Sequence, residues 1–246
     1  MTARRPICAL LEWDSGFFGF KVARLDSTHL NPKILHKCIQ WCKVNEIRCL
    51  YFLADSSDSQ TTQIAEENSF RFVDIRVTYQ VKLPTPQRAD KWTNGGIIRL
   101  SRTEDIPKLH AIARVSFQET RFYHDPHFPK HLCDRLYEIW IEKSCLDPTQ
   151  AVFVADRQGE PVGFIACNQI NRELGQIGLI GVAPEMQGQG VGRQLIQASL
   201  DWFEQQGLES AMVVTQGRNV PAQRLYQKKG FVIQSLQLWY HRWFDK

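Results

Sequence analysis

The chain has 246 residues, which is enough for one large domain or two of modest size. Its content of 43% hydrophobic and 23% charged residues is typical of a globular protein and argues against intrinsic disorder. The net charge of +4 is too mild to predict nucleic-acid binding, and no apolar stretch reaches the length of a membrane span. We therefore expect a globular protein that binds no nucleic acid and inserts into no membrane.

Seven cysteines are spread along the chain, and no two are spaced C-x-x-C. Cys38 and Cys42 lie one helical turn apart, but the seven together fit neither a zinc site nor a disulfide framework. His124, His127 and His131 fall in a proline-containing segment without ligand-like spacing, which favours loop packing or substrate contact over metal binding. We therefore expect reduced thiols, no metal and a cytoplasmic location.

Residues 1–86 are predicted to form a small α/β domain. Residues 10–25 combine four aromatic side chains with two glycines and are interpreted as strand, turn and strand. Asn31 followed by Pro32 predicts a helix start, because asparagine caps a first turn and proline suits the first helical position. The elements expected next are a buried strand over 49–54, a short helix over 58–67 and a strand over 70–83. The side chains expected to be buried on this last strand are Phe72, Ile75, Val77, Tyr79 and Val81.

Prolines and paired glycines between Pro84 and Gly96 predict a linker. A second α/β domain is predicted over residues 97–246. Its expected elements are a strand over 97–100, helices over 103–117 and 130–143, a hairpin over 151–168, a strand over 177–182, a helix from 191 to Gly207, a strand over 211–215, a helix over 220–228 and an extended pair over 231–244.

The stretch QIGLIGVAPEMQGQGVGRQL, residues 176–195, combines a strand, a glycine-rich turn and a helix. Residues 177–182 are apolar and uncharged, as in a buried strand, and Pro184 ends the strand because it has no amide hydrogen. Apolar residues recur at helical spacing from Val191 onward. Free amides and the positive end of the helix dipole bind phosphate, so this stretch predicts a phosphate site rather than a plain chain reversal.

The spacing of the glycines separates this turn from two common phosphate-binding motifs. A dinucleotide fingerprint beginning at Gly188 would need glycine or alanine in place of Arg193, and a P-loop would need a Lys-Ser or Lys-Thr pair at the helix start. What remains is Q-x-x-G-x-G, formed by Gln187, Gly190 and Gly192 after a strand that ends in Val-Ala-Pro. This motif resembles the pyrophosphate-binding turn of the GNAT superfamily of acetyl-CoA-dependent N-acetyltransferases.

A second motif supports the resemblance. Asn219, Ala222, Tyr226, Gly230 and Phe231 match the N-x-x-A-x-x-x-Y-x-x-x-G-F pattern of the same superfamily, and they follow the first motif in the expected order. The resemblance implies a mixed, mostly antiparallel sheet flanked by helices, with acetyl-CoA as the acetyl donor. The residues that it implies for binding acetyl-CoA are Ile180, Gly181, Val182, Gln187, Gly188, Gln189, Gly190, Val191, Gly192, Arg193, Asn219, Ala222 and Tyr226.

Acetyl transfer to an amine needs a cradle for the donor, hydrogen-bond donors for the carbonyl oxygen, a neutral amine and a proton for the leaving thiolate. The resemblance implies that the amides of Ile180 and Val182 hold the carbonyl oxygen and that Tyr226 supplies the proton. Without the motifs, Tyr226 would be interpreted as a helix-packing residue. No general base is evident, and water can take the proton from a weakly basic amine. The candidates, each better explained as a surface charge, are Glu119, His124, Glu173 and Glu185.

Further segments extend the resemblance to the TDP-fucosamine acetyltransferases, which acetylate the 4-amino group of a nucleotide-linked 4-amino-4,6-dideoxy sugar for cell-envelope glycan synthesis. They span nearly the whole chain and are LLEWDSGFFGFKVARL, TRFYHDPHF with YEIWIEKS, VVTQGRNVPAQRLYQKKGF and SLQLWYHRW. The resemblance implies direct transfer in a ternary complex, with Arg121 paired to a diphosphate oxygen. The implied acceptor-binding residues are Phe17, Phe18, Arg121, Phe122 and Tyr123, although core packing explains Phe17 and Phe18 equally well.

The two halves of the chain end in similar segments. Residues 65–83 and 226–244 each contain a helix end, a phenylalanine and a long alternating strand, but the first half has no Q-x-x-G-x-G turn. We therefore expect residues 1–86 to be a degenerate half of a GNAT domain that shapes the acceptor site beside residues 97–246. Two other functions stay open: acetylation of a different amine (a protein N-terminus, a polyamine or an antibiotic) and non-catalytic binding of acyl-CoA. A homodimer is also left open.

Overall fold

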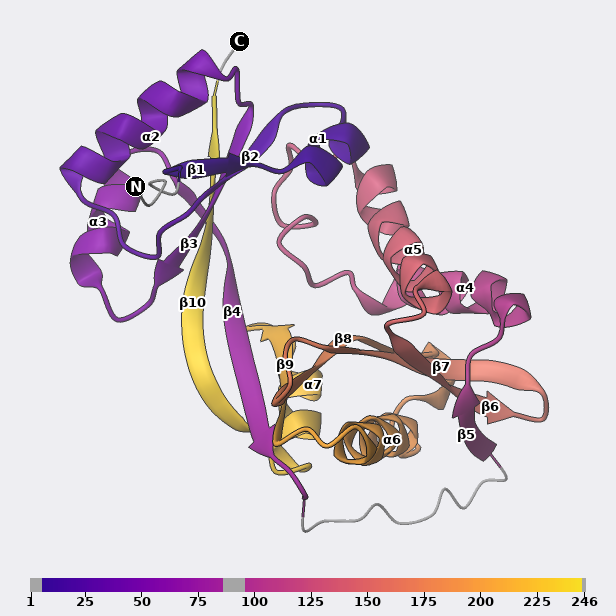
Figure 1. The fold of residues 1–246 in the computed structure, drawn as a ribbon. Helices are drawn as coiled ribbons and strands as arrows, with labels where there is room; N and C mark the ends of the chain where they lie inside the picture. The colour runs from indigo at the N-terminus through magenta and orange to yellow at the C-terminus, as the bar shows by residue number, and fades with distance from the viewer. Residues whose placement is uncertain (1–5, 86–95, 245–246) are drawn as a thin grey trace.

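A computed structural model describes residues 6–85 and 96–244 of the chain. Within these residues ten strands form one sheet, in the order β1-β2-β3-β10-β4-β9-β8-β7-β6-β5 (Figure 1). The elements of the first half are β1 (Cys8–Leu10), α1 (Glu12–Phe18), β2 (Val22–Leu25), α2 (Pro32–Val44), β3 (Cys49–Asp55), α3 (Ser59–Glu67) and β4 (Arg71–Lys82). Those of the second half are β5 (Gly96–Leu100), a 3-10 turn (Thr103–Asp105), α4 (Ile106–Ser116), α5 (Lys130–Leu146), β6 (Ala151–Arg157), β7 (Glu160–Gln169), β8 (Leu174–Val182), a 3-10 turn (Pro184–Met186), α6 (Val191–Gln205), β9 (Ser210–Gln216), α7 (Val220–Gln227) and β10 (Val232–Trp243).

Short-range side-chain contacts start the two main helices of the first half. The Asn31 side chain accepts a hydrogen bond from the Ile34 amide at 2.9 Å, and Pro32 is the first residue of α2, as the sequence predicts. In α3, the carboxylate of Asp58 accepts from the Thr61 amide at 3.1 Å. In both helices a capping side chain thus pairs with a backbone amide of the first turn.

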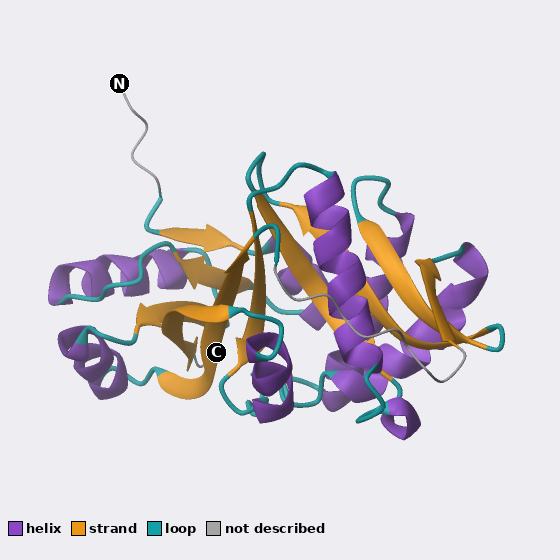
Figure 2. Cartoon of the chain, turned by 90° about the horizontal axis from the view of Figure 1, so that it is seen from below, coloured by secondary structure: helices purple, strands orange, loops and turns teal. Residues whose placement is uncertain are grey.

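The sheet is mixed and mostly antiparallel, and it joins both halves of the chain. β10, the last strand, lies between β3 and β4 and pairs antiparallel with both (Figure 1). Helices flank the twisted sheet on both sides, with α4 and α5 on one face of β7 and β8 and α6 on the other (Figures 1 and 2). Most buried apolar residues form one core, and a smaller core lies under β1, β3, α2 and α3.

One prediction about the first half is wrong, because residues 12–18 form the helix α1 instead of part of a strand-turn-strand unit. Gly19, with a φ angle of 77°, ends this helix, so the glycine acts as a helix terminator rather than as the turn of a hairpin. Ser15 Oγ also accepts a hydrogen bond from the Val22 amide at 2.9 Å, which ties the helix to β2. Gly16 lies inside α1, and a glycine in that position does not predict a helix.

Two further expectations about strands differ from the structure. Residues 231–244 form the single strand β10 instead of an extended pair, since β3 and β4 supply a partner on each side. In β4, Phe72 was expected to be buried but is 43% exposed. Pairing with β10 skips Val73, so Phe72 lies opposite Tyr240, with 6.0 Å between ring centroids, at the outer end of β4.

The predicted linker over residues 84–96 lies for the most part outside the described residues. In the described part of the chain, no helix is both long and apolar enough to cross a membrane.

Candidate active site

The central strands β8 and β9 separate part-way along their length. Their parallel pairing stops at Ile177 and Val213, although both strands continue. Gly178, the next residue of β8, is an extra residue that makes a bulge against β7, and beyond it β8 pairs with β7 alone. The resulting opening exposes one edge of β8 at the place where the predicted carbonyl-binding residues Ile180 and Val182 lie.

The turn between β8 and α6 leads into an uncapped helix start. Gly188 and Gly190 have φ angles of 76° and 87°, in the left-handed region that glycine adopts without a Cβ clash. Gly190 precedes the first helical residue, Val191, and has no side chain that could cap the helix. The first amides of a helix have no partner within it, so those of α6 are available to an anion. This helix start therefore fits phosphate.

Close contacts hold this turn against its neighbours. Gln187 Nε2 donates to the carbonyl oxygen of Val182 at 3.1 Å, which ties the turn to the end of β8. A Cβ atom on Gly192 would lie 3.0 Å from Leu225 of α7, so glycine allows the two helices to approach. These contacts hold the turn against the end of β8 and α6 against α7, the elements that carry the residues predicted to bind acetyl-CoA.

Helix α7 carries the second motif. The side-chain oxygen of Asn219 accepts from the Ala222 amide at 3.2 Å, so it serves as the cap of α7 and leaves only its amide group for a ligand. Tyr226 is 2% exposed, and its ring packs against those of Tyr79 and Phe231 at 5.8 and 6.0 Å between centroids. Burial, together with the neighbouring Tyr79, raises the pKa of Tyr226 well above its usual value. The phenol therefore keeps its proton at neutral pH.

On the other face of the sheet, residues 117–129 connect α4 to α5 and lie beside the central strands (Figure 1). Phe122 of this segment and Phe18 of α1 pack with Phe128, at ring-centroid distances of 5.2 and 4.6 Å. Phe18 and Phe122 are only 5% and 8% exposed. Two of the predicted acceptor residues thus belong to a buried aromatic cluster that supports the site.

Two other predicted acceptor residues have partners of their own. Phe17 stacks on Trp13 with 5.0 Å between ring centroids and 8° between ring planes. The hydroxyl of Tyr123 donates to Asp134 at 2.6 Å. These contacts position both side chains without a ligand.

Arg121 is held differently from these aromatic residues. Its guanidinium carbon lies 4.4 Å from the ring centroids of Tyr51 and Phe122 and 4.2 Å from that of Trp239. It makes no salt bridge or hydrogen bond with any described residue, and its Nε atom is buried. A planar cation framed by aromatic rings, with its donors unused, is suited to a carboxylate or a phosphate.

Several polar groups around Arg121 were missed by the sequence reasoning. The hydroxyls of Tyr51 and Thr120 are buried and meet no strict hydrogen-bond geometry with a described residue, although Tyr51 lies near Asp14 and Thr120 near Tyr137. Burial raises the pKa of Asp14, while the nearby Arg121 opposes the shift. Asp74 is 3% exposed on β4. Its one sequence signal was an acidic residue inside the alternating run RFVDIRV.

Asp125 fixes the 117–129 segment to β10. This buried carboxylate accepts hydrogen bonds from His241 Nδ1 at 2.7 Å, Trp243 Nε1 at 2.8 Å and His127 Nδ1 at 2.7 Å. Although burial alone would raise it, these hydrogen bonds hold the pKa of Asp125 well below its usual value. Burial lowers the pKa of His241 to about 4, so its ring is neutral at pH 7. His127 therefore helps to pack the 117–129 segment against β10.

Three cysteines meet in the smaller core, which their sequence spacing did not predict. The Sγ atoms of Cys8, Cys38 and Cys42 all lie within 4.8 Å of one another, and those of Cys8 and Cys38 are 3.2 Å apart. All three are buried, and all seven cysteines of the chain are free thiols.

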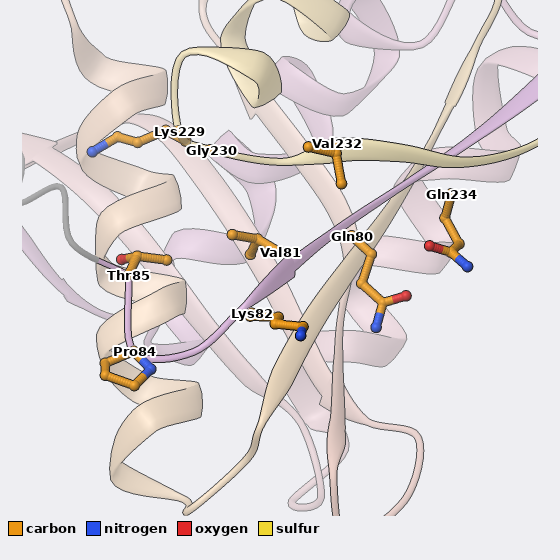
Figure 3. Close-up of a pocket in the computed structure, with 9 residues that line it drawn as sticks. All are labelled: Gln80, Val81, Lys82, Pro84, Thr85, Lys229, Gly230, Val232 and Gln234. Carbon is orange, nitrogen blue, oxygen red and sulfur yellow. The ribbon is translucent and has the colours of Figure 1, made fainter.

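A cavity of about 610 Å³ opens between the end of β4 and the start of β10 (Figure 3). Its lining includes Lys82, Thr85, Lys229 and Val232. None of the residues predicted for donor or acceptor binding lines it, so this cavity is separate from the opening between β8 and β9.

The second half of the chain is similar to a known protein family. Residues 109–231, half of the chain, match the model of the acetyltransferase (GNAT) family. The chain belongs to the GNAT family. It is therefore an N-acetyltransferase that uses acetyl-CoA as its acetyl donor.

Individual proteins extend the similarity beyond this GNAT segment. The dTDP-fucosamine acetyltransferase of Escherichia coli O6:H1 is 24% identical over 243 residues, which are 96% of this chain and 100% of the relative. A spore coat polysaccharide biosynthesis protein of Bacillus subtilis is 26% identical over 58% of this chain and 49% of its own. The solved structure of a GCN5-related N-acetyltransferase from Sphaerobacter thermophilus has a TM-score of 0.67 at 15% identity, covering 96% of this chain and 76% of that chain. This last likeness concerns the fold alone.

Proposed function

We propose that the protein acetylates the amino group of a nucleotide-linked 4-amino-4,6-dideoxy sugar of the TDP-fucosamine type. The observation that carries this proposal is Arg121, an unpaired guanidinium framed by aromatic rings on the acceptor side of the sheet. A nucleotide diphosphate offers anionic oxygens to such a cation and a flat base to aromatic rings. The whole-length similarity to the E. coli dTDP-fucosamine acetyltransferase supports the same substrate class.

The residues of this chain suit direct transfer between two bound substrates. In this proposal the turn from Gln187 to Arg193 and Asn219 hold the pyrophosphate and the adjoining arm of acetyl-CoA. The amides of Ile180 and Val182 stabilise the carbonyl oxygen, and one such preorganised donor contributes about 3 kcal/mol to the transition state. Tyr226, protonated at neutral pH, gives its proton to the leaving thiolate.

We also propose that residues 1–86 are a degenerate half-GNAT unit beside a GNAT domain over residues 97–246. Apart from α1, which is inserted between β1 and β2, the series β1-β2-α2-β3-α3-β4 has the same order of strands and α-helices as β7-β8-α6-β9-α7-β10. Its pairings match as well, with β1 and β2 antiparallel like β7 and β8, β2 and β3 parallel like β8 and β9, and β3 next to β10 as β9 is next to β4. In this proposal the first unit has become a wall of the acceptor site, to which it contributes Tyr51 and Asp14.

We place the reaction in the cytoplasm. All seven cysteines are free thiols although three of them are in contact, and a reducing compartment would keep them so.

Thiol release from acetyl-CoA, measured against a panel of amines, tests the proposed substrate. The panel contains TDP- and UDP-linked 4-amino sugars, a 3-amino sugar, polyamines and short peptides. We expect turnover confined to one nucleotide-linked amino sugar. Turnover on peptides or polyamines alone would leave the GNAT activity in place and overturn the proposed acceptor, and binding of acetyl-CoA without any turnover would support a non-catalytic module.

A further inference from the structure

Asp74 lies beside the opening between β8 and β9, on the acceptor face of the sheet. The pairing of β4 with β9 ends at Arg76 and Gln216, and the Gly217 amide then donates to the carbonyl oxygen of Ile75 at 2.8 Å. Asp74 is the next residue along β4, so it stands just beyond the end of β9. It pairs with Trp239 of β10, whose ring lies under the guanidinium of Arg121, and paired residues share one face of a sheet.

The carboxylate of Asp74 is buried without being fully engaged. Oδ1 accepts from the Ile75 amide at 2.8 Å and lies 3.7 Å from Arg218 Nε. Oδ2 makes no hydrogen bond with any described residue. A carboxylate that is 3% exposed costs free energy to bury unless it gains a partner, so a cationic or hydrogen-bonding ligand at Oδ2 would offset that cost.

The charges that face Asp74 come from three elements. Arg218 lies between β9 and α7, Arg121 and Glu119 lie in the 117–129 segment, and Tyr137 lies on α5. Burial raises the pKa of Asp74 to about 6, although the Ile75 amide and the two arginines favour its ionised form. At pH 7 the group is therefore ionised, yet it binds a proton far more readily than a surface aspartate does.

We propose that Asp74 binds the protonated amino group of the acceptor and accepts a proton from it, which makes Asp74 a catalytic residue of the proposed reaction. Arg121 and Asp74 then bind opposite ends of the acceptor: the guanidinium binds the anionic diphosphate, and the carboxylate binds the cationic amine. Asp74 fits this role better than Glu119, whose side chain is 61% exposed, because a buried carboxylate is held in one position beside the site. This inference rests on the proposed acetylation of an amine.

The acetyl transfer needs only Asp74, Tyr226, the two substrates and water. Asp74 takes one proton from the ammonium and later passes it to water. The neutral nitrogen forms the bond to the acetyl carbon, and the carbon–sulfur bond breaks. Tyr226 protonates the thiolate, and the second proton lost by the nitrogen restores the phenol. The products are the amide, the free thiol and one proton released to solvent.

Asp74→Asn, which keeps the shape of the side chain, tests this assignment through the pH dependence of kcat/KM. For the wild type we expect kcat/KM to fall below about pH 6, as Asp74 becomes protonated. In Asp74→Asn we expect this acid limb to disappear and kcat/KM at pH 7 to drop by about 10² to 10³. The deficit should shrink at alkaline pH, where the free amine has already lost its proton. Acetyl-CoA affinity and thermal unfolding should stay close to wild type.

A pair of charge variants gives a second measurement that does not require Asp74 itself to be changed. Arg218→Gln removes a cation that favours ionised Asp74, so the acid limb should move to higher pH. Glu119→Gln removes an anion, so the limb should move slightly to lower pH, with little loss of rate because Glu119 is exposed. A limb that stays in place in both variants, or an Asp74→Asn enzyme within threefold of wild type, would overturn the assignment.

The kinetic test uses whichever amine of the panel is turned over. If only polyamines or peptides react, the nucleotide-sugar proposal fails while the pH profile still decides the role of Asp74. If no amine reacts, both proposals are overturned.

Discussion

Helices α2 and α6 occupy corresponding places in the two halves of the sheet, since each connects one strand to the parallel strand beside it. Their starts differ. The side chain of Asn31 closes α2, and Pro32 has no amide hydrogen to leave unpaired. Helix α6 starts after Gly190, which has no side chain. In the proposed function, this difference between the two helix starts is what lets the second half hold the phosphates of acetyl-CoA.

The strands that precede these helices, β2 and β8, also differ in how far they continue past their pairing. β2 ends at Leu25, one residue past its last pair with β3. β8 continues through residues 178–182 after it has parted from β9, and the bulge at Gly178 marks the point of separation. The first half thus has the same strand pairing without the opening, and in the proposed function it contributes to the site through side chains such as Tyr51.

The largest expected effect concerns Tyr226, whose counterpart in the repeated segment of the first half is Ala65. Tyr226→Phe removes the proposed proton donor but keeps the packing against Tyr79 and Phe231. We expect kcat to fall by about 10² or more, with acetyl-CoA affinity nearly unchanged. Steady-state kinetics together with calorimetric binding would measure both. Unchanged turnover would remove Tyr226 from the mechanism.

The glycine turn can be tested with two glycines at opposite ends of the α6 region. Gly190→Ala forces alanine into a φ angle of 87° at the phosphate site, and we expect the Kd for acetyl-CoA to rise about tenfold. Gly207→Ala imposes similar strain at a φ angle of 74° just beyond the other end of the helix. This control should lose about 1 kcal/mol of stability without any change in Kd. Equal effects on binding would mean that the turn acts through stability alone.

A variant of Arg121 tests whether this residue serves the acceptor site alone. Arg121→Gln should raise the KM for the nucleotide-linked acceptor about tenfold, because it removes a charged hydrogen-bond donor, while the KM for acetyl-CoA stays the same. Arg114→Gln is the matched control, since that surface arginine already pairs with Glu138. If both KM values rose together in Arg121→Gln, the residue would have a general structural role.

The smallest effect is expected at the helix start of the first half. Asn31→Ala should lower the free energy of unfolding by about 1 kcal/mol, because the Ile34 amide loses its cap. Acetyl-CoA binding should not change, in contrast to Gly190→Ala. Denaturant unfolding and calorimetry give the two values, and a weakened affinity for acetyl-CoA would contradict the assignment of the donor site to the second half alone.

Local sequence patterns predicted the helix starts and the glycine turn, while the surroundings of Arg121 depend on strand pairing between distant parts of the chain. The Asn31–Pro32 helix start and the glycines at 188 and 190 follow from neighbours in the sequence, and both were confirmed as structural features. Tyr51 and Asp74 come to face Arg121 only because β10 lies between β3 and β4. No local pattern encodes that arrangement. The helix over residues 12–18 was missed because its aromatic residues and internal glycine favour a strand and a turn.

The position of β10 also constrains how the protein is made. Val232–Trp243 are synthesised after both β3 and β4, yet they lie between these two strands in the sheet. Until they emerge from the ribosome, β3 and β4 each have an unsatisfied edge, and unpaired edges favour association with other chains. A chain that stops before Val232 would therefore be expected to aggregate, even though most of both cores is already present.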